Sequence, residues 1–206
     1  MMDINEMFMK KNYEILKNKL DLDINNNADS LNHTISNFID LKAISLNKYI
    51  IEMYDDLKIK YNNKKIKKII EEESKILKEI FLNAIDERKK QISSFFYKEI
   101  DVTKITDEYL EDYHNHIDNL TENFKNNIEI SAREEICTNF SQILVKENKL
   151  PDVYSREKLL EYINKFYCNS VIEKIVSESI LRNTTLKNLS KEAFKRFKSM
   201  NEKTVS

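Results

Sequence analysis

Glycine is absent from this 206-residue chain, and proline occurs only once, at Pro151. Average usage would supply about 14 glycines and about 10 prolines in a chain of this length. Glycine provides the positive-φ turns of β-hairpins and the phosphate-binding loops of many nucleotide-binding folds. Its absence therefore excludes most nucleotide-binding and tight β-turn architectures, and it predicts long helices joined by a few short turns.

Long apolar runs and cysteines are scarce as well. No run approaches 18 apolar residues, and the N-terminal segment is charged rather than apolar. The sequence thus contains no recognisable transmembrane span or signal peptide, and we expect a soluble cytoplasmic protein. The two cysteines, Cys137 and Cys168, are 31 residues apart and belong to no Cys/His cluster, which favours reduced core thiols over a disulfide.

The residues that are present suit amphipathic helices. Apolar residues make up 41% of the chain, and 34 basic residues face 35 acidic ones, for a net charge of −1. This composition is typical of a globular protein with solvated helix faces, and the overall charge indicates neither nucleic acid nor a membrane as a partner. Asn, Ile and Lys are abundant while Ala and Arg are few, which indicates an AT-rich genome and weakens any argument from lysine alone.

The apolar spacing predicts six helices, of which the first covers residues 3–22. The cluster Asn25–Asn27 is expected to end it, because asparagine tolerates the left-handed conformation found at helix ends. Asp29 or Ser30 would cap the second helix. That helix carries a heptad seam from Ile39 to Leu57.

The heptad seam stops after Leu57, and Asn62 and Asn63 lie shortly after that point. This predicts a hairpin between helices over 30–61 and 64–97. The alternative is one continuous helix about 100 Å long, which would require dimerisation to cover its seam.

The fourth helix is expected to run from about Thr106 to Val145 without a break. Asn148–Asp152 contains the only proline and should end it. Ser155 could then cap a fifth, strongly apolar helix that extends to Leu181. The inward-facing stripe of the third helix is predicted to include Leu77, Ile80 and Phe81. That of the fourth helix is predicted to include Ile143 and Leu144.

These patterns predict an all-α protein, an elongated antiparallel helical bundle with long coiled-coil-like helices. We expect a single domain over residues 1–206. Residues 30–147 would form a long three-helix antiparallel core, with flanking helices at 3–22 and 155–200.

Charge placement gives the first candidate site. Residues 58–68 contain six lysines and no acid, whereas residues 99–122 contain eight acids and one lysine. In the antiparallel arrangement the two clusters would lie at opposite ends, ready for head-to-tail association or for binding phosphate groups or an acidic partner. The alternative is a solvated turn, because no arginine or interleaved aromatic residue accompanies the lysines. The six residues are Lys58, Lys60, Lys64, Lys65, Lys67 and Lys68.

The segment Thr185–Met200 is predicted to be a basic amphipathic helix. Such a helix suits an anionic membrane surface or the hydrophobic groove of a partner, and the alternative is a final bundle helix that docks on its own protein. Its candidate binding residues are Leu186, Lys187, Leu189, Lys191, Phe194, Lys195, Phe197 and Lys198.

Glu111, His114 and His116 form a candidate metal site, because Glu111 and His114 share one helix face. Di-iron bundles need a second ExxH motif, and the remaining histidine, His33, has Ser30 where the glutamate would be. We therefore interpret these histidines as surface residues and expect no metal and no cofactor. No arrangement of a nucleophile, a base and an oxyanion hole is recognisable, so we expect no catalytic residues. The run Glu71–Glu73 is typical of a solvated helix face.

The sequence best fits a non-enzymatic helical protein–protein interaction module, such as an adaptor, a scaffold subunit or an inhibitor. A homo-oligomer is a related expectation, because six amphipathic helices offer more apolar stripes than one bundle covers. The alternative is a polyanion binder, for nucleic acid or an anionic membrane, acting through the lysine-rich hairpin 58–68 and the basic C-terminal helix.

Overall fold

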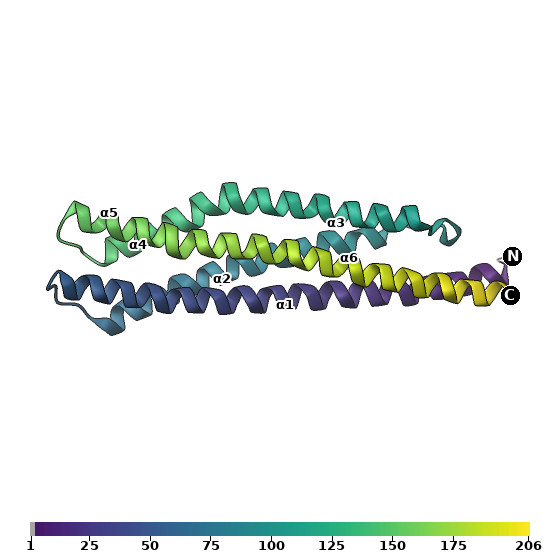
Figure 1. Ribbon diagram of the computed structural model, residues 1–206, viewed down its shortest axis with the longest axis horizontal. Helices are drawn as coiled ribbons and strands as arrows, with labels where there is room; N and C mark the ends of the chain where they lie inside the picture. Colours follow the sequence, from purple (N-terminus) through teal and green to yellow (C-terminus); the bar gives the residue numbers. More distant parts are fainter. Residues whose placement is uncertain (1–2) are drawn as a thin grey trace. The chain divides into compact units, whose positions relative to one another are not determined.

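The computed structural model describes residues 3–206, and every regular element in this range is a helix (Figure 1). This confirms the prediction of an all-α helical bundle. Within the same range, no helix combines the length and the apolar character that crossing a membrane requires.

The first element is one continuous helix, α1 (Ile4–Asp56), so the predicted helix end at Asn25–Asn27 is wrong. Asn27 is buried, and its side-chain amide donates a hydrogen bond to the carbonyl oxygen of Arg182 at 3.1 Å. Arg182 belongs to α6 (Asn169–Val205). Asparagine therefore makes a contact between helices here instead of ending one, and the cap predicted at Asp29 or Ser30 does not exist.

The hairpin prediction is confirmed, and the single continuous helix over its two arms is excluded. Helix α1 ends at Asp56 and α2 (Asn63–Ser93) begins after a short turn. Asn62 caps α2, because its side-chain oxygen accepts a hydrogen bond from the Lys65 N–H at 3.2 Å. Two short 3₁₀ turns follow α2: η1 (Ser94–Tyr97) and η2 (Val102–Lys104).

The predicted fourth helix is present, but its middle has a different geometry. It consists of α3 (Asp107–Asn127), the π-helix η3 (Ile128–Thr138) and α4 (Asn139–Glu147) without interruption. The helix ends as predicted before Asn148–Asp152. In that turn Lys149 adopts a positive φ of 46°.

The next helix begins as α5 (Val153–Tyr162), continues as the π-helix η4 (Ile163–Cys168) and merges with α6. Its cap is Asp152, whose side chain accepts a hydrogen bond from the Ser155 N–H at 2.7 Å. The prediction that Ser155 is the cap is therefore wrong by three residues. The predicted boundary between Leu181 and Thr185 is also wrong, because α6 passes through it unbroken.

The chain forms two compact units, each assembled from distant segments. Unit 1 contains the described residues up to Leu31, together with Ile85–Phe124 and Glu178–Ser206. Unit 2 contains Asn32–Ala84 and Lys125–Ser177. The two segments predicted to flank a three-helix core, 3–22 and 155–200, themselves supply core residues. The single domain over residues 1–206 stays a prediction.

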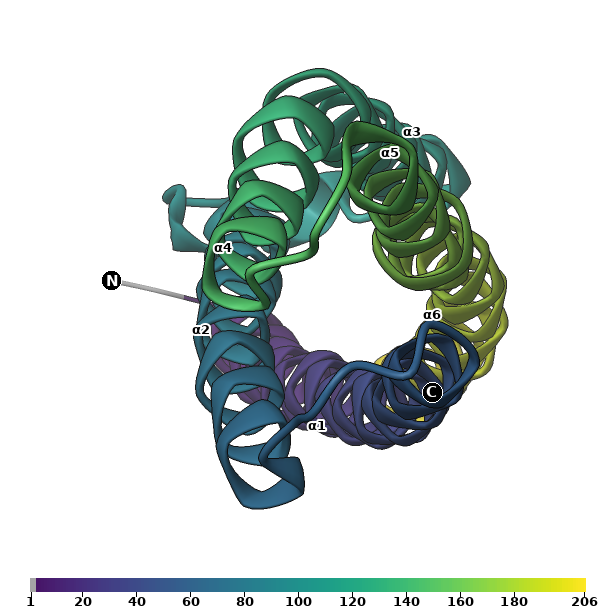
Figure 2. The ribbon, with the colours of Figure 1, turned by 90° about the vertical axis from the view of Figure 1, so that its left-hand side faces the viewer.

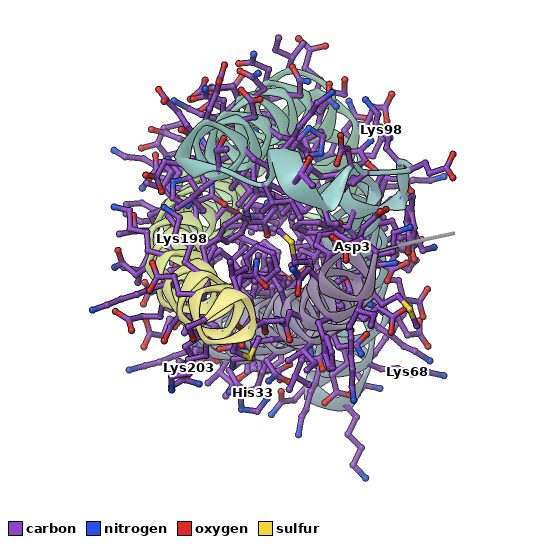
Figure 3. All side chains as sticks on the ribbon, turned by 90° about the vertical axis from the view of Figure 1, so that its right-hand side faces the viewer. Asp3, His33, Lys68, Lys98, Lys198 and Lys203 are labelled. Atoms are coloured by element: carbon purple, nitrogen blue, oxygen red, sulfur yellow. The ribbon has the colours of Figure 1, made fainter. Side chains whose placement is uncertain are left out.

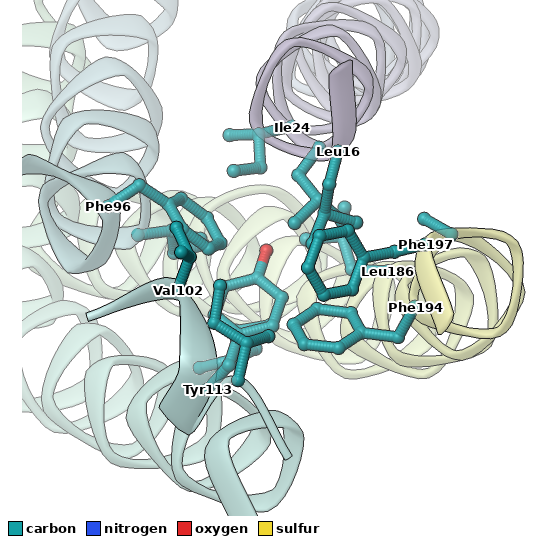
Figure 4. Packing of buried hydrophobic residues seen from close by; sticks show 13 residues of the cluster. Leu16, Ile24, Phe96, Val102, Tyr113, Leu186, Phe194 and Phe197 are labelled. Carbon is teal, nitrogen blue, oxygen red and sulfur yellow. The ribbon is translucent and has the colours of Figure 1, made fainter. Parts of the chain in front are cut away.

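The core of unit 1 joins four helices around Tyr113, which is 1% exposed (Figure 4). Helix α1 contributes Leu16 and Ile24, and α6 contributes Phe194 and Phe197. Charged side chains such as Lys98, Lys198 and Lys203 point outward from this unit (Figure 3). The remaining core residues are Leu20, Ile92, Phe96, Val102, Ile105, Ile117, Leu186 and Ala193.

The core of unit 2 is formed by α1, α2, the η3–α4 segment and the α5–η4–α6 segment. Cys137 and Cys168 lie in it as free, buried thiols, as predicted. The Cys168 Sγ lies 3.8 Å from the Cys137 carbonyl oxygen, and a hydrogen bond with the Cys137 thiol, together with burial, raises the pKa of Cys168. At one end of the unit, the α1–α2 turn and the α4–α5 turn lie together (Figure 2), where the Tyr54 hydroxyl donates a hydrogen bond to the Asn148 carbonyl.

Candidate functional site

All six lysines of the 58–68 cluster are exposed on unit 2, and Lys68 points away from the ribbon (Figure 3). Two of them have acidic neighbours one turn later. The Lys67 Nζ lies 3.9 Å from the Glu71 carboxylate, and the Lys68 Nζ lies 3.8 Å from the Glu72 carboxylate. Exposed pairs of this kind contribute little to stability, but they reduce the local positive charge. The acidic segment 99–122 belongs to unit 1, whereas the lysine cluster belongs to unit 2.

The apolar face of the C-terminal helix is packed inside unit 1. Leu186, Phe194 and Phe197 are only 2–3% exposed and belong to the core described above. Part of the basic face is also engaged: Lys187 Nζ lies 2.5 Å from an Asp118 carboxylate oxygen, and Lys198 pairs with Asp107. Leu186, Phe194 and Phe197 are therefore not free to enter a membrane or a partner groove. Leu189, Lys191 and Lys195 remain exposed.

The histidines of the 111–116 segment make hydrogen bonds within unit 1. His114 Nε2 lies 2.7 Å from the Ser190 hydroxyl, and His116 Nε2 lies 2.8 Å from the Gln91 carbonyl oxygen. Burial, followed by the nearby charges of Lys187 and Lys191, lowers the pKa of His114. Across the described part of the chain, no group of three or more His, Cys, Asp or Glu side chains is arranged to hold a metal ion.

A long apolar groove lies in unit 2 between α2 and the continuous η3–α4 segment, and its volume is about 560 Å³. The two walls are neighbouring helices: α4 lies next to α2 (Figure 2). Most of the lining is aliphatic or aromatic. The lining residues are Glu73, Ile76, Leu77, Ile80, Ala84, Asn127, Ile128, Ser131, Ala132, Glu135, Ile136, Asn139, Phe140 and Ile143.

Three isoleucines of this groove are open to solvent: Ile76 is 50% exposed, Ile80 41% and Ile143 39%. Two of them were predicted to face inward, and this prediction is wrong. Successive helix positions point about 100° apart, so a helix that buries Phe81 completely turns Ile80 toward the edge of the core. The same geometry applies to Ile143, which precedes the fully buried Leu144.

The floor of the groove is held by an aromatic contact. Phe140 stacks on Tyr167 of η4, with ring centroids 4.8 Å apart. The Tyr167 hydroxyl in turn lies 2.6 Å from the hydroxyl of Ser74 on α2. The groove is therefore part of a packed core rather than a gap between mobile helices.

Glu73 and Glu135 are the only charged residues among those that line the groove, one on each wall. Neither forms an ion pair with a basic side chain anywhere in the described residues, although the adjacent Glu71 and Glu72 both do. Burial, followed by the charge of Glu72, raises the pKa of Glu73. Glu73 is thus a partly desolvated carboxylate beside an apolar surface with no cation of its own.

Sequence patterns missed this site because Glu73 was interpreted as part of a solvated face. A usable signal was present in three neighbouring apolar pairs, Ile76–Leu77, Ile80–Phe81 and Ile143–Leu144. Such pairs widen the apolar face beyond the single stripe that one neighbouring helix covers.

No protein-family model, no curated protein and no solved structure matches this chain. The fold and the groove therefore define the class: an all-α helical bundle in which one unit carries an open apolar groove. Any function must be argued from these features themselves.

Proposed function

We propose that this protein is a non-enzymatic interaction module, an adaptor, scaffold subunit or inhibitor, that binds a partner protein through the groove between α2 and η3–α4. The observation that supports the proposal is the row of exposed isoleucines, Ile76, Ile80 and Ile143, in a preformed groove. Removing apolar surface from water is worth about 25 cal/mol per Å², so covering this row favours association. Contiguous apolar patches with a polar rim are typical of protein interaction sites.

We further propose the cytoplasm as its location. Cys137 and Cys168 are in hydrogen-bonding contact and yet are free thiols. Two adjacent thiols remain reduced most readily in a reducing compartment.

Site-specific photo-crosslinking tests the proposed interaction. A photoreactive amino acid replaces Ser131, an exposed groove residue, in the full chain expressed in its source cells. We expect a discrete crosslinked protein that disappears when Ile80→Glu is added. The matched control is Ile130→Glu, because Ile130 is 69% exposed in the same π-helix and does not line the groove. Equal crosslinking in both variants would contradict the proposal.

A polyanion-binding function is the second candidate, and the exposure of all six lysines between residues 58 and 68 favours it. Replacing Lys64, Lys65, Lys67 and Lys68 with glutamate should then abolish binding to nucleic acid or anionic vesicles. Binding through lysine–phosphate contacts should also fall steeply between about 50 mM and about 200 mM salt. Binding that is insensitive to salt would contradict this candidate.

A further inference from the structure

We infer that the partner segment seated in the groove is an amphipathic α-helix whose apolar stripe is flanked by lysine or arginine. This inference rests on the proposed function and adds the chemical class of the partner. It follows from the walls, the length and the charges of the groove.

The walls favour a helix over an extended peptide. Both walls are helical, so their backbone N–H and C=O groups are largely used within the helices, and the groove has no strand edge to pair with. The uncharged polar side chains that line it are Asn127, Ser131 and Asn139. An extended segment would leave most of its backbone groups without partners there, whereas a helix satisfies its own.

The length of the groove matches a short helix. Its α2 wall runs from Glu73 to Ala84 with lining residues at helical spacing. At 1.5 Å per residue this wall is about 17 Å long, or about three helical turns. A helix of that length presents anchors at i, i+4 and i+7, the spacing typical of helix-in-groove recognition.

The charges specify the flanks of the partner helix. Glu73 and Glu135 lie on opposite walls, and neither has a cation within the described chain. Lysine and arginine can place their aliphatic stems along the isoleucines and their charged heads at these carboxylates. Hydrogen bonds between such charged groups are roughly twice as strong as neutral ones. Acidic flanks would instead meet like charge beside an apolar surface.

A second copy of this chain fits less well. An exposed helical stripe, Ile4, Phe8 and Ile15 on α1, has exposed fractions of 68%, 50% and 50%, but Lys11 occupies its i+7 position and interrupts the apolar row. Its flanks carry Glu6 and Glu14 as well as Lys10, and Lys10 already pairs with Glu6 at 3.4 Å. Self-association therefore serves as an outcome of the test.

The test uses a displayed library of amphipathic helical peptides about 18 residues long, selected on the full-length protein. Four positions at i, i+4, i+7 and i+11 vary among Leu, Ile, Phe and Met, and the flanking positions vary among Lys, Glu and Gln. Clones that bind the native chain and the Ile130→Glu control but not Ile80→Glu are counted as groove binders. We expect lysine to exceed glutamate at their flanks by at least about five-fold, and the preference to reverse on the double variant Glu73→Lys/Glu135→Lys.

The outcomes separate this inference from the proposed function. Groove binders with no charge preference, or with glutamate enriched, would overturn the inference and leave groove binding intact. A complete lack of Ile80-dependent clones would overturn both. Analytical sedimentation of the protein without peptide tests self-association. A dimer that dissociates when Ile80→Glu is introduced would assign the groove to a second copy and overturn the inference. Far-ultraviolet circular dichroism of each variant establishes that the helices are retained.

Discussion

The hydroxyl oxygen of Ser74 lies 2.6 Å from the hydroxyl oxygen of Tyr167 in the core of unit 2. Ser74 is 3% exposed and Tyr167 is fully buried. Because Tyr167 also stacks on Phe140, this hydrogen bond joins the floor of the groove to the wall that carries Glu73 and Ile76. The shape of the groove therefore depends on a polar contact beneath its apolar surface.

The first prediction concerns this contact. Tyr167→Phe and Ser74→Ala should each lower the free energy of unfolding by about 1–3 kcal/mol, because each leaves one buried hydroxyl without a partner. The double variant should lose less unfolding free energy than the sum of the two single losses, because it leaves no buried hydroxyl without a partner. Urea denaturation of the four proteins measures this coupling, and strictly additive effects would contradict the hydrogen bond.

The second prediction compares two neighbouring residues of α2. Ile80→Ala should cost less than about 1 kcal/mol, because Ile80 is 41% exposed and loses little burial. Leu77→Ala should cost about 2–5 kcal/mol, since it opens a cavity at a residue that is 3% exposed. Thermal and urea unfolding provide the comparison. A large loss of stability in Ile80→Ala would mean that this side chain belongs to the core and not to an open site.

The third prediction concerns alkaline pH. Burial, as the largest cause, raises the pKa of Tyr109, Tyr113 and Tyr167 in the folded protein. The unfolded phenol has a pKa of about 10, so the folded state binds more protons above that pH. Stability from these groups is complete below about pH 10 and is lost as the pH rises above it. Arg88 acts in the opposite direction, because burial lowers its pKa to about 10, but three tyrosines outweigh one arginine.

Absorbance at about 295 nm detects the phenolates, and circular dichroism detects the helices. We expect part of the phenolate signal to appear only together with the loss of helix above pH 10. If all tyrosines titrated while the helices were intact, the three phenols would not be buried as described.

The fourth prediction concerns the start of α5. Asp152→Ala should cost about 1 kcal/mol, because it removes the side-chain acceptor for the Ser155 N–H. Asp152→Asn keeps an acceptor oxygen and should retain most of that stability. The difference between the two variants in urea denaturation isolates the cap. Equal stability of Asp152→Ala and the native chain would contradict its role.

The sequence predicted the turns where the chain reverses direction. It did not predict all the positions where a helix continues through a polar segment. Asn62 and the Asn148–Asp152 segment lie in real turns, as their composition indicates. Asn27 and Asn183 lie in equally polar surroundings in the sequence, yet both are buried within helices. Asn183 accepts a hydrogen bond from Arg88 and donates one to Thr121. A contact to a distant helix thus overrides the local preference of asparagine, and a single sequence carries no signal of that contact.

The same limit applies to the candidate site. Apolar periodicity located α2 and the η3–α4 segment, and it assigned Leu77, Phe81 and Leu144 correctly to the core. It could not separate them from Ile80 and Ile143, because both sets fall on one broad apolar face. Which part of that face stays open depends on how neighbouring helices cover it, and on the π-helical geometry of η3, neither of which the residue pattern specifies.

Among the described residues, Lys58 and Lys149 adopt positive φ angles, 54° and 46°. For a residue with a Cβ atom this conformation costs about 1–2 kcal/mol, because the Cβ approaches the following carbonyl oxygen. Both lysines lie in the turns of unit 2, where most chains would place glycine or asparagine. A chain assembled without glycine therefore stores conformational strain at the two turns of unit 2. Either turn could be relaxed by a single codon change that leaves the core and the groove untouched.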